Sequence, residues 1–92
     1  MRQAIGLVET KGLVAAIQAA DTMVKSADVH IVDLDVVGSA LIAVIVSGEV
    51  AAVNAAVESA RETAAQLGEI IATNVIARPH EEVDKMLDVI VG

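Results

Sequence analysis

The order in which hydrophobic periodicity changes along the chain is the feature that most limits its fold. Four segments have the continuous or alternating apolar character of strands, residues 3–9, 28–37, 40–46 and 69–77. Helical periodicity follows the first and the third of these segments. The order strand–helix–strand–strand–helix–strand is that of the ferredoxin-like βαββαβ fold, in which two helices cover one face of an antiparallel sheet. We therefore expect an α+β domain of this type, with a short C-terminal helix opened by Pro79.

The first helix is expected to begin after Thr10, whose side-chain oxygen can cap it, with Lys11 and Gly12 in the first turn. Its larger apolar positions recur at spacings of four, three and four, at Leu13, Ile17, Ala20 and Val24. This spacing predicts one continuous apolar face. The helix is expected to end near Lys25, because a positive charge suits a helix C-terminus.

Two further patterns refine the expected elements. Strand 28–37 alternates between apolar and polar residues with one slip at Val32–Asp33, so one of its faces should be wetter than the other. The second helix should begin at residues 47–49 and stop at Gly68. Its apolar stripe is the clearest in the sequence and consists of Val50, Val53, Val57, Ala60, Ala64 and Leu67.

The chain has more apolar residues than a small monomer can easily bury. It has 92 residues, which is enough for one domain, 1–92, and 55% of them are hydrophobic. A chain of this length buries only about 60–65% of its unfolded surface. The longest apolar run, Ala40–Val46, is far shorter than the ~20 residues of a membrane-spanning helix, and the N-terminus does not resemble a signal peptide. We therefore expect a cytoplasmic protein whose extra apolar surface is covered by other copies of the chain.

Composition also excludes several kinds of site. The chain has no cysteine and no aromatic residue, and its net charge is −7, so disulfides, thiolate sites and nucleic-acid binding are not expected. Glu9 has no acidic or basic partner at a catalytic spacing, and His30 and His80 lie on different elements. We therefore predict no catalytic residue, no metal site and no cofactor.

Four segments, in this order, carry a resemblance to a known family. They are IGLVETKGLVAAIQAADTMVKSADV (5–29), the GS turn (38–39), VIVSGEVAAV (44–53) and GEIIATNVIARPH (68–80). The chain resembles single-domain bacterial microcompartment shell proteins of the hexamer-forming type. The resemblance implies cyclic hexamers that tile with neighbouring hexamers and other shell proteins into the facets of a shell around encapsulated enzymes. It also implies a narrow central pore for small polar metabolites, and no membrane.

The resemblance places the pore at the turn that contains Val37, Gly38, Ser39 and Ala40. Glycine allows close backbone approach, and a ring of serine hydroxyls and backbone N–H groups offers hydrogen bonds without fixed charge. An ordinary hairpin turn is the alternative interpretation of Gly-Ser. The sequence departs from common members at Val36, where many have a polar or basic residue, and at Ala40, where many have glycine.

The resemblance also implies a set of contacts at the edges of the hexamer: Lys25, Asp28, Arg78, Pro79 and His80. A lysine stem can cover apolar surface while its ammonium binds carbonyl oxygens, and a planar guanidinium can make several fixed hydrogen bonds. Asp28 stands where many members have asparagine. For Lys25 the alternative role is neutralisation of the helix dipole, and for His80 it is a purely structural one.

Two other functions compete with a shell protein. A small ferredoxin-like regulatory or ligand-binding module needs a defined pocket, and the sequence has no Gly-rich phosphate loop or cluster of convergent polar residues. An enzyme of the acylphosphatase type needs an arginine and an asparagine that converge on a phosphate. Neither Asn54 nor Asn74 has an arginine at a convincing offset.

Overall fold

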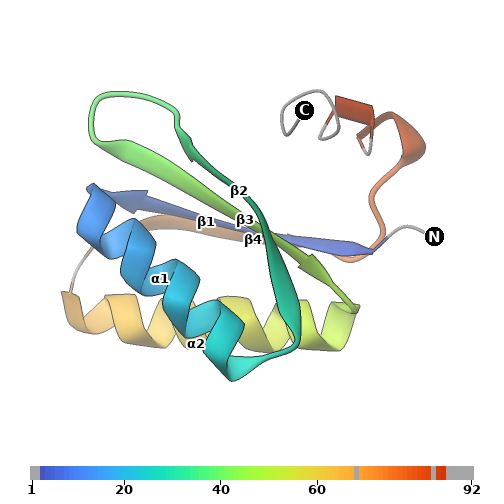
Figure 1. Ribbon diagram of the computed structural model, residues 1–92, viewed down its shortest axis with the longest axis horizontal. Coiled ribbons are helices and arrows are strands. Elements are labelled where there is room, and N and C mark those ends of the chain that lie inside the picture. The colour runs from blue at the N-terminus through green and yellow to red at the C-terminus, as the bar shows by residue number, and fades with distance from the viewer. Residues whose placement is uncertain (1–2, 68, 84, 87–92) are drawn as a thin grey trace.

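The computed structural model describes residues 3–67, 69–83 and 85–86. Its elements are β1 (Ala4–Lys11), α1 (Leu13–Ser26), β2 (Val29–Val36), β3 (Leu41–Gly48), α2 (Val50–Leu67) and β4 (Ile70–Ile76). All strand pairs are antiparallel, the sheet order is β2-β3-β1-β4, and both helices cover one face of the sheet (Figure 1). Residues 81–83 are also helical, after Pro79. The predicted α+β, ferredoxin-like architecture is confirmed.

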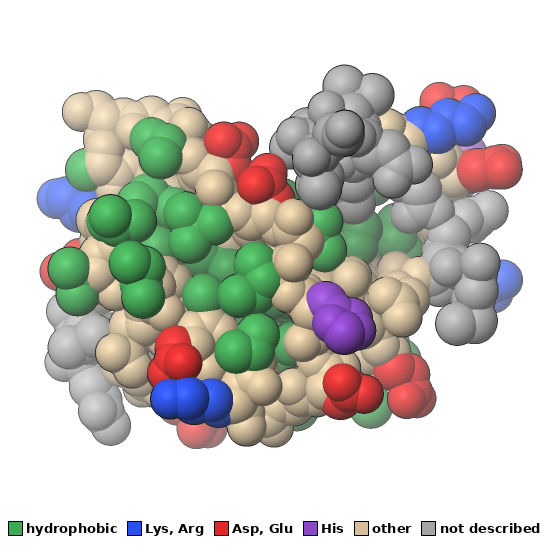
Figure 2. Space-filling view, viewed as in Figure 1, with side chains coloured by type: hydrophobic (Ala, Val, Ile, Leu, Met, Phe, Trp, Pro, Cys, Tyr) green, Lys and Arg blue, Asp and Glu red, His purple; other side chains and the backbone are tan. Residues whose placement is uncertain are grey.

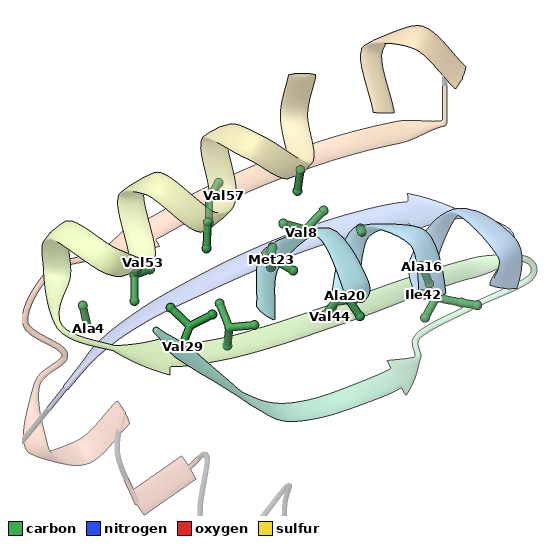
Figure 3. Close-up of a cluster of buried hydrophobic side chains, with 14 residues drawn as sticks. Ala4, Val8, Ala16, Ala20, Met23, Val29, Ile42, Val44, Val53 and Val57 are labelled. Carbon is green, nitrogen blue, oxygen red and sulfur yellow. The ribbon is translucent and has the colours of Figure 1, made fainter. Parts of the chain in front are cut away.

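A core of small aliphatic side chains lies between the helices and the sheet (Figure 3). Val8, Val44 and Val53 are fully buried in it, together with Met23. Alanine and valine let the helices lie close to the sheet. At Gly6 the approach is so close that an added Cβ would lie 2.8 Å from methyl carbons of both Val53 and Val57. The core is therefore thin and closely packed, because its side chains are small and the chain has no aromatic residue.

The start of α1 differs from the prediction. β1 continues to Lys11, which pairs with Leu41, so Thr10 and Lys11 belong to the strand and not to the helix. Thr10 is completely buried and its hydroxyl lies 3.4 Å from the Gly12 carbonyl oxygen and 3.5 Å from that of Ile42. Gly12 takes the N-cap position without a side-chain hydrogen bond. Backbone pairing with two neighbouring strands has outweighed the capping tendency of threonine.

The buried face of α1 also differs from the predicted one. The helix buries its smallest residues and Met23, namely Ala15, Ala16, Ala19, Ala20 and Met23. Leu13, Ile17 and Val24 are exposed, so only Ala20 of the predicted face points into the core. Close approach of the helix to the sheet selects alanine, and the larger apolar side chains are left outside.

The start of α2 also differs from the prediction, because Ser47 and Gly48 still belong to β3 and the helix begins at Val50. The slip at Val32–Asp33 is a register shift between Ile31 and Asp33 in the pairing of β2 with β3. Three stripe residues of α2 are buried, Val53, Val57 and Ala60, whereas Val50, at the first position of the helix, is exposed. The side chains of Ala64 and Leu67, and the predicted stop at Gly68, lie outside the described residues. No helix in the described part of the chain has the length and hydropathy needed to cross a membrane.

Candidate functional site

The strand pairing separates the predicted functional residues into two groups at opposite ends of the sheet. The loop of residues 37–40 joins β2 to β3 at the end where β1 finishes and α1 begins. Asp28 precedes β2 and Arg78 follows β4 at the other end, where Ala4 pairs with Gly48. Figure 1 shows this loop at one extreme of the molecule and the segment after β4 near the other.

The loop is held by two backbone hydrogen bonds. The Val37 N–H donates to the Leu41 carbonyl at 3.0 Å, which closes the turn. The Gly12 N–H donates to the Ala40 carbonyl at 2.6 Å, which ties the loop to the start of α1. All four loop residues are exposed, and the only polar side-chain group among them is the Ser39 hydroxyl. The loop can therefore offer a hydroxyl and free backbone groups to a solute, but no fixed charge.

Large apolar side chains surround this loop on the side that the helices occupy. Val14 is 82% exposed and Val36 is 68% exposed, and Leu13, Ile17 and Val37 are each at least half exposed. We call these five residues the loop-end patch. Leu13 and Val14 line a surface hollow of about 520 Å³ together with Ala40, and Figure 2 shows hydrophobic side chains gathered over this region. Such a gathering on a small domain indicates an interaction surface.

The register of β2 explains why the patch is apolar on one side only. Leu34 and Val36 pair with core residues of β3 and so point to the helix-covered face of the sheet. Asp33 and Asp35 alternate with them and point to the opposite, open face, as does Glu9 of β1. These carboxylates therefore form the wetter side of the strand that the sequence predicted. Within the described residues, no cluster of three or more His, Cys, Asp or Glu side chains could hold a metal ion.

The five predicted edge residues lie at the far end of the sheet but not in one cluster. Lys25, in the last turn of α1, has its Nζ 2.9 Å from Asp21 Oδ2, and Asp28 is exposed just before β2. Arg78 and His80 are exposed after β4, Pro79 is buried, and His80 Nδ1 accepts a hydrogen bond from the Glu82 N–H at 3.1 Å.

The two groups of edge residues belong to opposite margins of the sheet. Because β2 and β4 are separated by β3 and β1, three strand spacings or about 14 Å lie between them. The residues before β2 and those after β4 therefore lie at opposite margins of the sheet.

Comparisons with known proteins identify the family of this chain. A family model described as the BMC domain matches residues 4–79. The bacterial microcompartment shell protein PduA of Citrobacter freundii is 52% identical over 86 residues, which cover 94% of this chain and 92% of PduA. The chain belongs to the family of bacterial microcompartment shell proteins.

Two further relatives extend the comparison. The carboxysome shell protein CsoS1A of Hydrogenovibrio crunogenus is 46% identical over 85 residues, which cover 91% of this shell protein and 88% of CsoS1A. The crystal structure of a microcompartment protein from Desulfitobacterium hafniense superposes with a TM-score of 0.84 at 28% identity. That alignment covers 97% of this chain but 48% of the other, so this chain spans about half the length of that protein. The shell protein described here has a structural role, and it assembles with other shell components.

Two features of the loop end were missed from the sequence. Val14 was not assigned to any surface, although its position beside the alanines that face the core places it on the outer side of α1. Ala40 has a φ of 67°, in the left-handed region that favours glycine. The departure from glycine at this position was visible in the sequence, but its backbone angle was not.

Replacing Ala40 with glycine is expected to stabilise the protein. The left-handed conformation costs an alanine about 1–2 kcal/mol, and the added freedom of glycine in the unfolded chain offsets about 0.5–1 kcal/mol. The free energy of unfolding should therefore rise by about 0.5–1 kcal/mol, measured by urea denaturation at a fixed protomer concentration. Gly38→Ala is the matched control, because its Cβ would meet only Leu41 atoms at 4.0 Å. A lower stability for Ala40→Gly would contradict the strain at this residue.

Proposed function

We propose that six copies of this chain form a ring whose axis is lined by residues 37–40, and that these rings tile into the facets of the shell. The observation that carries the proposal is the loop-end patch, which is apolar and exposed beside a loop with a polar tip. If the loops of six copies meet at one axis, the surfaces that flank each loop must face the neighbouring copies. Ring formation would thus bury the apolar side chains that a single chain leaves in water.

The dimensions of the chain agree with this arrangement. Its extents are 35 × 28 × 17 Å, and Figure 1 shows the loop near one end of the longest direction and the segment after β4 near the other. A ring with the loops at its centre would be two such lengths across, about 70 Å. Electron microscopy of assembled protein is therefore expected to show flat sheets with a repeat near 70 Å. A repeat nearer to 35 Å would contradict a ring of this orientation.

The proposed solute of the central opening is a small polar metabolite without charge. Six Ser39 hydroxyls and the backbone groups of Gly38 would surround the axis, while Val37 and Ala40 add apolar contacts and no loop residue adds charge. Asp33 and Asp35 lie on the open face of the sheet, outside the loop itself. The chemistry of the loop therefore offers hydrogen bonds to hydroxyl and carbonyl groups but no ion pair.

Ser39→Leu is expected to leave assembly intact and to reduce solute flux. Ser39 is exposed, so leucine should not affect folding. Six leucine side chains at the axis would narrow the opening and exclude water from it. Flux of a small diol through assembled shells should fall at least about tenfold. Ser39→Thr, which keeps the hydroxyl, should retain most of it. Equal flux through shells of the leucine and threonine variants would show that solutes pass elsewhere.

The proposed contacts between rings use Lys25 and Asp28 before β2 and Arg78, Pro79 and His80 after β4. Since these groups lie at the end of the sheet opposite the loop, they would form the outer rim of the ring. The stem of Lys25 is exposed, and its ammonium could leave Asp21 for a carbonyl oxygen of the next ring. An exposed ion pair of this kind holds the side chain only weakly, by about 0.2–1 kcal/mol.

Lys25→Asp is expected to keep the hexamer and abolish sheets. It places a carboxylate beside Asp21 at the rim, so neighbouring rings would repel each other while the loop end is unchanged. Arg61→Asp is the matched control, because Arg61 is an exposed base of α2 that contacts Glu58 and Thr73 of its own chain. Electron microscopy should show dispersed rings for the first variant and sheets for the second. Sheets from both variants would remove Lys25 from the proposed rim.

The remaining partners follow from the same assembly. We propose that residues 1–92 act as one shell domain, that the shell encloses enzymes, and that this chain has no catalytic activity of its own. The structural role of the shell-protein relatives supports that last point. The alternative of a separate ligand-binding module is not favoured by these relatives.

A further inference from the structure

Ala40 has a strained backbone angle that no packing of its side chain compensates. Its φ of 67° is strained for an alanine, and it is the only non-glycine residue with a positive φ in the part of the chain that the structure describes. Its side chain is exposed, so packing of the methyl group does not compensate the strain. A glycine would take the same conformation without this cost.

One hydrogen bond opposes the strain directly. The Ala40 carbonyl accepts from the Gly12 N–H at 2.6 Å, and Gly12 has a φ of 90°, which glycine adopts without steric cost. If Ala40 relaxed to a negative φ, the adjoining peptide groups would rotate and this bond would break. The N–H of Gly12 would then be free to bind water, because Gly12 lines the open hollow beside the loop.

We infer that residues 37–40 form a two-state loop, held in the described conformation by the Gly12–Ala40 hydrogen bond and biased towards a second conformation by the strain at Ala40. Rotation about φ of Ala40 turns the Ser39–Ala40 peptide group, so the two states place the Ser39 hydroxyl differently. In the hexamer, the two loop conformations would give the central opening two different shapes, and this consequence rests on the proposed function. The loop equilibrium itself does not, because both partners of the hydrogen bond belong to one chain.

The test is amide hydrogen exchange at Gly12 in the unchanged 92-residue chain and in Ala40→Gly. Glycine removes the strain that drives opening, so the exchange of the Gly12 amide should slow by about two- to fivefold. The intrinsic exchange rate of Gly12 is not altered, because residues 11–13 are unchanged. In Gly38→Ala, whose added Cβ has room, the Gly12 amide should exchange at the wild-type rate.

A second amide separates local from general effects. The Ala27 N–H donates to the Met23 carbonyl at 3.3 Å at the far end of the sheet, and its exchange should be the same in all three proteins. Unchanged or faster exchange of Gly12 in Ala40→Gly would overturn the inference, as would equal slowing at Gly12 and Ala27. Native mass spectrometry of the same samples reports the hexamer separately. A monomeric sample with slowed Gly12 exchange would therefore reject the proposed ring and retain the two-state loop.

Discussion

Val14→Asp is expected to convert the assembled protein into a folded monomer. Val14 is 82% exposed on the single chain, so the substitution removes no core contact and should leave the fold intact. In the proposed ring the same position lies against a neighbouring copy, where an unpaired carboxylate would lose its hydration at a cost of several kcal/mol per interface. Because every copy in a closed ring has two such neighbours, even the lower end of this range should prevent assembly.

The control for this experiment lies one turn further along the same helix. Gln18 is also exposed on α1, but it lines the polar groove between the helices and not the loop-end patch. Gln18→Asp introduces the same charge and should leave the hexamer unchanged. Native mass spectrometry gives the mass, and circular dichroism with urea denaturation checks that both variants are folded. A hexameric Val14→Asp protein would show that this patch is not the ring interface.

Gly6→Ala is expected to destabilise the protein strongly for a change of one methyl group. The new Cβ would lie 2.8 Å from Val53 Cγ1, 2.8 Å from Val57 Cγ2 and 3.1 Å from Val46 Cγ2. These valines are fully or almost fully buried and have stiff, β-branched side chains, so α2 must move away from the sheet. After the gain from restricting the unfolded chain, about 1–2 kcal/mol of stability should be lost.

The comparison with Gly38→Ala isolates this steric effect. Both variants add one methyl group to a glycine without a positive φ, but only the Cβ at Gly6 meets atoms closer than 3.4 Å. Thermal unfolding at fixed protomer concentration should show a midpoint lower by roughly 5–15 °C for Gly6→Ala and little change for Gly38→Ala. Equal midpoints would mean that α2 and the sheet are less closely packed than described.

The order of elements could be predicted from the sequence because each strand and helix has its own periodicity. The Val32–Asp33 slip even located the register shift of β2. The face of α1 could not be predicted in this way, because the large apolar side chains of an amphipathic helix usually mark its buried face. The helix approaches the sheet so closely that alanines fill the core, and Leu13, Ile17 and Val24 remain outside.

The candidate site was predictable in position but not in conformation. The Gly-Ser turn identified the loop, and the motif around Lys25 and that around Arg78 identified segments that the strand pairing then brought to one end of the sheet. The register of β1 also overrode the capping propensity of Thr10, which is a local signal. The backbone angle of Ala40 depends on the contact with Gly12, and these residues lie far apart in the sequence.

The apolar excess of the chain and its exposed loop-end patch lead to one central claim, that copies of this chain cover each other in a closed ring of six. Native mass spectrometry of the 92-residue chain at micromolar concentration tests it most directly. The chain has a mass of 9.4 kDa, so six copies give about 56 kDa, and this species should dominate. A spectrum dominated by the 9.4 kDa chain or by its dimer would contradict the ring, the axial position of Ser39 and the role of Val14 together.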